Sequence, residues 1–383
     1  MKIKKTIVYV NFSPYDNAGR FLDFLTASFD WVIHFSYDHL RLQNGRKTNI
    51  LTVYHKRKVV ERKQLIPLRT PEFLRFFSLP GVALLILFQT WWHTWRLKRK
   101  LEVIDYYFTV NAYTTWIGNI LKRRKLVKKT IFWVWDYYPP GFPDWRLKFL
   151  RWIYWKFDRP ALQGANKIVS ISEKLVTLRF QLGALTPNHS YQIIPIGTNP
   201  IKKTLNKEKP VMGFMGMLKE SQGLNLMFDN LSKLQEKFPH LKIEIVGSGP
   251  QETYFRQKAA KFKRMVRFYG YVEKENDVDK IIRRWSAGLA TYLPVASNES
   301  YWTDPSKIKA YISQGVPVIV TNVPDFVNEI RKYKAGIVID YHKPIQLFQA
   351  IQKLIDNQSF YSHNALNLSR RYYYKKLYPK FFL

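Results

Sequence analysis

Short apolar segments alternate with amphipathic segments along most of this 383-residue sequence. They form two series, separated by residues 191–210, a segment rich in Pro, Gly, Asn and Lys and without helical periodicity. Strands that alternate with helices of this length imply parallel sheets with helices on both faces. The sequence therefore predicts an α/β fold of two Rossmann-like domains whose parallel sheets face a central cleft.

The expected strands are short apolar runs that are rich in β-branched or aromatic residues, and the expected helices lie between them. We predict strands within residues 6–12, 49–56, 103–111, 129–139, 165–171, 211–218, 241–250, 266–272, 287–294 and 316–322. We predict helices within residues 17–29, 173–183, 222–239, 252–262, 278–286 and 306–315, with Ser172 as the N-cap of the second. We expect an N-terminal domain at 1–195, a C-terminal domain at 205–358, and a helix or tail at 359–383 that returns to the N-terminal domain.

Composition restricts the chemistry. The sequence contains no Cys, which excludes disulfides, thiolate metal sites and thiol nucleophiles. Its first twelve residues have only a short apolar run with polar interruptions, which indicates a first strand and not a signal peptide. The 62 basic and 28 acidic residues give a formal net charge of +34. Such a charge attracts nucleic acid, anionic lipid or phosphorylated substrates.

Residues 304–315 predict a short helix with a cation in its first turn. Asp304 is a favourable N-cap, Pro305 suits the first helical position, and Gly315 is the expected stop. One apolar face is formed by Ile308, Tyr311 and Ile312. The open N–H groups of a helix N-terminus bind anions, whereas a cation there is unfavourable. Lys307 therefore indicates an anion opposite it; the alternative is a solvated Lys on a surface helix.

The order of the motifs in the second series is more specific than any one of them. Gly216 follows a strand, Gly223 opens a helix, and "IEIVGSGP", "VRFYGYV", "ATYLP" and the Lys-bearing helix before "GVPVIVT" come next. This order resembles the nucleotide-sugar-binding domain of GT-B glycosyltransferases of the family-four (group 1) type. The resemblance covers residues 205–355, and it extends more loosely into the first series through "ANKIVSISE" and "IIPIGTNP".

The resemblance implies a site for the donor diphosphate. Gly216 and Lys219 would lie in the loop that faces it, and the N-terminus of the helix with Lys307 would grip it. A loop with Gly19 and Arg20 would touch it from the other domain, unless this loop is a plain turn with a solvated Arg. The nucleotide base would pack near Tyr269 or Tyr271. The full set of expected donor-binding residues is Gly19, Arg20, Gly216, Lys219, Gly247, Gly249, Tyr271, Glu299, Asp304, Ser306 and Lys307.

Four positions depart from the family pattern. Met217 replaces the usual Arg, and Gln222 replaces the usual Lys, so Lys219 would supply the missing charge. The pair of Glu residues is absent, because Trp302 and Ala310 occupy its positions. Two nearby carboxylates that would substitute for it are Glu299 and Asp304. A carboxylate beside a diphosphate is repulsive, so we expect Asp304 to contact a sugar or ribose hydroxyl.

The first series supplies a candidate general base. Asp136 ends an apolar strand in an aromatic and Pro-rich setting, where desolvation would raise the pKa of its carboxyl group. An inverting GT-B enzyme needs such a carboxylate to deprotonate the acceptor hydroxyl. We expect Asp136 to contact the acceptor and to share the catalytic role with Lys307; the alternative is an Asp that caps a turn.

Two segments of the first series are both aromatic and basic. Residues 79–100 have an apolar run of about ten residues, shorter than the roughly 20 of a spanning helix, followed by Trp and basic residues. Residues 145–159 form a second segment of this kind. Such segments are typical of interfacial anchors, although an aromatic core helix with a basic rim has the same composition. We expect a cytoplasmic protein that lies peripherally on the anionic inner face of the cell membrane and uses a polyprenyl- or lipid-linked glycan acceptor.

The expected reaction is transfer of a sugar from a nucleotide-diphosphate donor to a hydroxyl of a lipid-linked or cell-surface glycan, without a cofactor. No Asp or His cluster has metal-site spacing, so we expect a metal-independent enzyme with no metal ligands. One alternative is a basic nucleic-acid-binding protein, although no recognised nucleic-acid-binding signature is present and no nucleic acid is expected as a partner. The other is a GT-B-like protein that has lost activity, which Ala310 and Gln222 permit.

Overall fold

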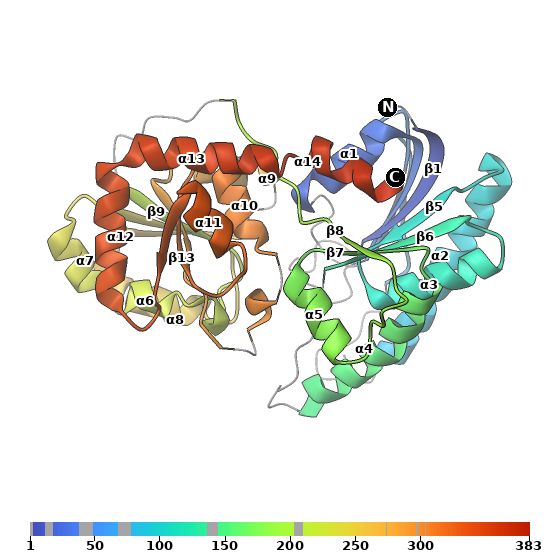
Figure 1. Ribbon diagram of the computed structural model, residues 1–383, viewed down its shortest axis with the longest axis horizontal. Helices are drawn as coiled ribbons and strands as arrows, with labels where there is room; N and C mark the ends of the chain where they lie inside the picture. Colours follow the sequence, from blue (N-terminus) through green and yellow to red (C-terminus); the bar gives the residue numbers. More distant parts are fainter. Residues whose placement is uncertain are drawn as a thin grey trace. The chain divides into compact units, whose positions relative to one another are not determined.

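The computed structural model describes residues 3–11, 18–37, 49–67, 78–135, 145–202, 210–272, 274–295, 298–302 and 304–383 (Figure 1). The chain divides into two compact units. Unit 1 comprises residues 1–195 and 378–383, and unit 2 comprises residues 196–377. Residues 359–377 thus lie in unit 2, and the chain enters unit 1 again only for its last six positions.

Unit 1 contains an eight-stranded sheet with the order β4-β3-β2-β1-β5-β6-β7-β8. The strands are β1 (Ile3–Asn11), β2 (Phe29–Ser36), β3 (Ile50–His55), β4 (Lys58–Gln64), β5 (Tyr106–Thr109), β6 (Lys129–Val134), β7 (Lys167–Ser170) and β8 (Tyr191–Ile193). Strands β2, β1 and β5 to β8 pair in parallel, whereas β3 pairs antiparallel with β2 and β4. The sheet is therefore mixed at one edge, which the sequence prediction did not include. The two residues between β3 and β4, Lys56 and Arg57, have φ angles of 46° and 73°, as a tight hairpin turn requires.

The helices of unit 1 are α1 (Phe21–Ser28), α2 (Leu79–Leu101), α3 (Ala112–Arg123), α4 (Trp145–Gly164) and α5 (Glu173–Gln181). Two of them, α3 and α5, begin at a residue whose side chain caps the helix. Asn111 accepts a hydrogen bond from the Tyr113 N–H at 2.9 Å, and Ser172 accepts one from the Leu175 N–H at 3.2 Å. The prediction that Ser172 caps the helix after β7 is confirmed.

The last residues of the chain complete the core of unit 1. The ring of Tyr378 lies 5.1 Å from that of Phe21, and the ring of Phe381 lies 4.9 Å from that of Trp133. The Tyr378 hydroxyl also donates to the Gly19 carbonyl at 2.8 Å. These contacts join residues 378–383 to the start of α1, from which they are far apart in the sequence.

Unit 2 contains a six-stranded parallel sheet with the order β11-β10-β9-β12-β13-β14. Its strands are β9 (Val211–Met215), β10 (Lys242–Val246), β11 (Val266–Gly270), β12 (Ala287–Ala290), β13 (Val318–Thr321) and β14 (Gly336–Ile339). Its helices are α6 (Asn225–Phe228), α7 (Leu231–Lys237), α8 (Glu252–Lys258), α9 (Glu275–Ile282), α10 (Ser306–Ser313), α11 (Val327–Tyr333), α12 (Pro344–Asp356), α13 (Gln358–Arg371) and α14 (Tyr374–Leu377). In chain order this is the doubly wound arrangement 3-2-1-4-5-6, whose direction reverses between β9 and β12.

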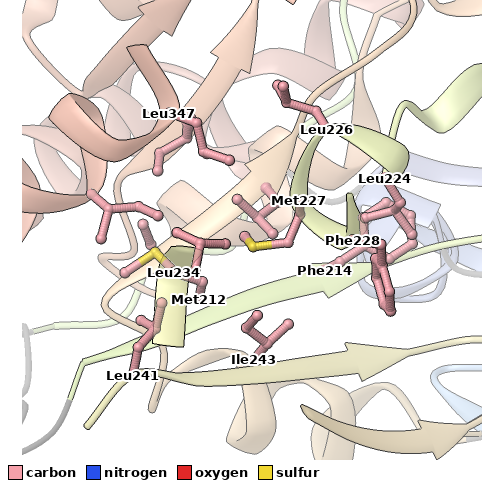
Figure 2. Close-up of a cluster of buried hydrophobic side chains, with 14 of the residues drawn as sticks. Met212, Phe214, Leu224, Leu226, Met227, Phe228, Leu234, Leu241, Ile243 and Leu347 are labelled. Carbon is pink, nitrogen blue, oxygen red and sulfur yellow. The ribbon is translucent and has the colours of Figure 1, made fainter. Parts of the chain in front are cut away.

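Both faces of this sheet are buried, as parallel sheets require. Along β13, Ile319 belongs to one apolar cluster, whereas Val318 and Val320 belong to the cluster on the other face. Figure 2 shows the first cluster, in which Met212 and Phe214 of β9 and Ile243 of β10 lie with side chains from the covering helices. Helix α13 packs against α10 and α11. The sheet is therefore a rigid base for the loops at its ends.

Candidate functional site

Loops at the carboxyl ends of β9 and β12 lie next to each other at the point where the strand order reverses. The Leu293 N–H donates to the Ser221 carbonyl at 3.1 Å, and the Asn298 amide donates to the same carbonyl at 2.8 Å. The Thr291 hydroxyl donates to the Gly223 carbonyl at 3.1 Å. In open α/β sheets, ligands bind at this point of reversal. Hydrogen bonds therefore hold these two loops together, and the loops form one side of the candidate site.

Three predicted glycines allow a third loop, the one after β10, to approach the loop after β9. Gly216 and Gly247 have φ angles of 144° and 124°, which favour glycine. A Cβ atom on Gly247 would lie 2.0 Å from the Gly216 carbonyl oxygen, and one on Gly249 would lie 2.5 Å from the Leu218 nitrogen. The structure thus brings together Gly216, Gly247 and Gly249, since no larger residue would allow these backbones to approach.

Lys307 extends into the same region from the first turn of α10. Its side chain is buried, with 9% of the residue exposed. Its ammonium group donates to the side-chain oxygen of Gln222 and lies 4.0 Å from the ring centre of Phe214 and 5.1 Å from that of Tyr292. The ammonium nitrogen would lie 3.2 Å from a Cβ atom on Gly216. The predicted Lys is therefore an interior residue at the edge of the glycine loops.

The charge of Lys307 is costly without an anion. Burial, and secondly the charge of Lys219, lower the pKa of the Lys307 ammonium well below its usual value. The contacts described above come from an amide and from aromatic rings, and these groups carry no formal negative charge. A buried cation of this kind favours an anionic ligand. Because the charge of Lys219 contributes to this lowered pKa, Lys219 lies near the Lys307 ammonium.

The structure differs from the prediction at Asp304. Helix α10 begins at Ser306 with Pro305 as its N-cap, so Asp304 is not the N-cap and Pro305 is not the first helical residue. The Asp304 carboxylate instead accepts hydrogen bonds from the Lys309 ammonium at 2.5 Å and from the Ile196 N–H at 2.8 Å. The capping prediction was wrong because a buried cation five residues later draws the carboxylate inward. Since this carboxylate is bound by Lys309 and Ile196, we do not include Asp304 in the proposed donor site.

The remaining expected donor residues of unit 2 occupy different positions. Ser306 is exposed at the start of α10. Tyr271 is exposed just after the carboxyl end of β11, whereas the Tyr269 hydroxyl donates to Glu244 at 2.9 Å. Tyr271 is thus more accessible for stacking than Tyr269. Glu299 begins a short 3-10 helix (Glu299–Tyr301), and its side chain lies outside the described part of the chain.

In unit 1, Gly19 and Arg20 follow β1 in a short 3-10 helix, and both have φ angles of 61°. The Arg20 guanidinium lies 3.5 Å from the Asp23 carboxylate. Asp136 falls outside the described residues, and β6 ends at Val134. Among the described residues there is no group of three or more His, Cys, Asp or Glu side chains that would hold a metal ion.

Gln222 was missed as a partner of Lys307. The sequence marked it as the loss of a Lys, but its side-chain oxygen is the acceptor for the Lys307 ammonium. The aromatic partners of Lys307, Phe214 and Tyr292, were missed too. Their only signal in the sequence was an aromatic residue near the end of a strand, which also fits an ordinary core position.

The fold is that of the GT-B glycosyltransferases. The chain is similar in structure to sucrose-phosphate synthase from Thermosynechococcus elongatus, with a TM-score of 0.69 at 14% identity over 98% of this chain and 97% of that chain. It is similar to Anabaena HepE in complex with UDP and glucose, with a TM-score of 0.65 at 13% identity over 96% and 95% of the two chains. It is also similar to WaaG, a glycosyltransferase involved in lipopolysaccharide biosynthesis, with a TM-score of 0.63 at 16% identity over 98% of each chain.

Residues 196–372 match the family model of the glycosyl transferases group 1. This segment, which holds the glycine loops and Lys307, matches the group 1 family, and the fold of the whole chain is that of the GT-B glycosyltransferases. The family predicted from the order of motifs is confirmed. No curated protein matches the sequence significantly.

Proposed function

We propose that the protein transfers a sugar from a nucleoside-diphosphate donor, held in unit 2, to a hydroxyl of a lipid-linked or cell-surface glycan. The observation that carries the donor part is Lys307, a buried ammonium in the first turn of α10 beside the Gly216 backbone. During transfer the negative charge grows on the leaving diphosphate, so this cation stabilises the transition state more than the ground state. Lys219 and the N–H groups at the start of α10 add to this stabilisation.

The nature of the donor is supported by the fold and by the similar structures. HepE was solved with UDP and with UDP-glucose, which identifies a uridine nucleotide as the first donor to test. Tyr271 is our proposed stacking partner for the base because it is exposed at the carboxyl end of β11. We propose that the reaction needs no metal ion.

A thermal-shift experiment with UDP, GDP, ADP and a single-stranded oligonucleotide tests the donor site. A ligand present at about 100 times its Kd stabilises the folded state by about 2.7 kcal/mol, and we expect one of the nucleotides to do so in the presence of EDTA. The formal charge of +34 makes nucleic acid the main competing ligand, which is why the oligonucleotide is included. Stabilisation by the oligonucleotide and by none of the nucleotides would reject the donor site.

The acceptor part of the proposal is supported by the outer faces of α2 and α4 in unit 1. On α2, Leu84, Phe88 and Trp92 are exposed, with Leu84 reaching 67%, and the helix ends in the basic turn Lys98–Lys100. The opposite face of α2 is buried against the unit, so these aromatic side chains are not part of the core. Such a helix binds at a membrane interface.

Helix α4 presents a second surface of this kind. Trp145, Phe149 and Trp152 are exposed, and the Lys156 ammonium lies 5.2 Å from the Trp152 ring centre. Helices α2, α3 and α4 lie side by side in unit 1 (Figure 1). None of the described helices is long and apolar enough to cross a membrane. We therefore propose that unit 1 lies peripherally on an anionic cytoplasmic membrane face, where a polyprenyl- or lipid-linked acceptor would be located.

Sedimentation with vesicles tests this surface. We expect the protein to pellet with vesicles that contain an anionic lipid, to bind neutral vesicles less, and to lose part of its binding at high salt. Replacing both Trp92 and Trp152 with Ser should weaken the binding about tenfold or more, because two interfacial anchors are lost. Phe360→Ser is the matched control, since Phe360 is exposed to 49% on α13 of unit 2. Equal binding of the control and the double variant would reject the proposed surface.

We propose Asp136 as the general base that accepts the proton of the acceptor hydroxyl. It follows β6 by two positions in the sequence, and the carboxyl ends of the strands in this sheet are where a ligand is expected. An Asp136→Asn enzyme with undiminished turnover would remove Asp136 from this role.

A further inference from the structure

The ion pair between Asp304 and Lys309 is buried beside the donor site, and the proposed function does not use it. The side chains of Lys309 and Asp304 are 2% and 5% exposed. Besides Asp304, the Lys309 ammonium donates to the Ile196 carbonyl at 2.9 Å and lies 4.6 Å from the ring centre of Tyr372. The pair therefore holds the Asp304 carboxylate in the interior of unit 2, where its Oδ2 atom accepts hydrogen bonds from Lys309 and Ile196.

This position of Asp304 leaves the start of α10 without a side-chain cap. The N-cap is Pro305, which makes no side-chain hydrogen bond to the helix. The first backbone bonds run from the Ile308 and Lys309 N–H groups to the Pro305 carbonyl. The N–H groups of Ser306 and Lys307 precede these bonds in the helix, and such groups are those that a capping carboxylate or a bound anion would satisfy.

We propose that Lys309 is a positioning residue, which holds the Asp304 carboxylate away from the N-terminus of α10 so that this N-terminus and Lys307 bind the diphosphate. The inference rests on the proposed function of the donor site. Asp is among the residues that most favour a helix N-terminus, and it lies one position before Pro305. A carboxylate released from Lys309 would therefore be drawn to the N–H groups and to the cation that the donor needs. It would compete with the donor and repel it.

Substitution of Lys309 and substitution of Asp304 should therefore change donor binding to different extents. Lys309→Met frees the carboxylate, and we expect the Kd for the nucleoside diphosphate to rise about tenfold. Asp304→Asn removes the competing charge, so its Kd should stay within about twofold of wild type although the pair is equally broken. The double variant Asp304→Asn/Lys309→Met should regain the wild-type Kd within about twofold. If the ion pair were only structural, both single variants would weaken binding alike.

Calorimetric titration of the full-length variants with UDP, GDP and ADP at about pH 7, above the usual pKa of a carboxyl group, measures these constants. Lys309→Gln is a second variant that keeps a donor for the Ile196 carbonyl but not the charge, and it should also weaken binding several-fold. The matched control is Arg179→Met, which breaks another buried pair, Arg179–Asp158 in unit 1, where the side chains are 3% and 6% exposed. We expect this control to lower Tm and to leave the Kd unchanged.

The possible outcomes distinguish an error about the role of Lys309 from an error about the donor site. If wild type binds none of the three nucleotides, the donor site is overturned, and the role of Lys309 with it. If wild type binds a nucleotide but Asp304→Asn weakens binding as much as Lys309→Met, only the role of Lys309 is overturned. An unchanged Kd for both Lys309 variants would overturn it as well.

Discussion

Lys307→Met should lower kcat/KM for the nucleotide-sugar by about 10²–10³-fold, because loss of one group that stabilises developing charge costs this much in other enzymes. The Met side chain fills a similar volume beside Phe214 and Gln222, so the free energy of unfolding should change little or increase. Initial rates of donor hydrolysis or transfer, together with Tm, measure the two effects. The matched control is Lys353→Met on α12, where a surface Lys of the same unit is removed.

A pH dependence follows from the same side chain. Burial and Lys219 lower the pKa of Lys307 in the free protein, and a bound diphosphate would raise it again because it favours the charged form. The nucleotide should therefore bind most tightly below the lowered pKa, and its affinity should fall as the pH rises through it. Titration in buffers of different ionisation enthalpy should show proton uptake on binding at alkaline pH. A turnover of Lys307→Met close to that of wild type would remove Lys307 from the mechanism.

Gly247→Ala should destabilise the protein by about 3 kcal/mol and weaken donor binding at least tenfold. Two causes act together: a φ angle of 124° is strained for Ala, and the added methyl group would lie 2.0 Å from the Gly216 carbonyl oxygen. Backbone cannot rotate away as a flexible side chain does, so the two loops must separate. Urea unfolding and titration with the nucleotide measure the two losses.

Gly183→Ala is the matched control for this substitution. Gly183 has a φ angle of 65°, and a Cβ atom there would have no neighbour within 4 Å. It should cost only about 1 kcal/mol of backbone strain and leave the Kd unchanged. Equal losses for the two variants would mean that the positive φ angle, and not the approach of the two loops, sets the cost at Gly247.

The architecture of the sheets was largely predictable, because apolar runs of strand length alternate with amphipathic runs. The ten expected strands all coincide with strands of the structure. Strands β2, β4, β8 and β14 were not predicted. The residues of β4 are mostly exposed and polar, so this strand has no apolar face to reveal it. The antiparallel pairing of β3 was missed for a related reason: a strand sequence does not state its direction, which here depends on the turn at Lys56 and Arg57.

At the proposed donor site, the close approach of the loops was predictable because it requires Gly, and Lys307 stood out as a cation in the first turn of a helix. Asp304 was misplaced because Asp before Pro predicts a cap from local rules alone. The inward turn of its side chain depends on Lys309 and on Ile196, which lies far away in the sequence. Likewise, the contact between Gln222 and Lys307 joins residues 85 positions apart, and no local pattern encodes such a distance.

The order in which the two units are made follows from the return of residues 378–383 to unit 1. Unit 2 is one continuous segment, so all of its residues are available as soon as residue 377 has been synthesised. Unit 1 begins first but receives Tyr378 and Phe381, which cover Phe21 and Trp133, only afterwards. During synthesis the unit that starts the chain therefore finishes last, and it exposes an aromatic surface until then. A fragment of residues 1–195 would keep that surface permanently and should aggregate more readily than the whole chain.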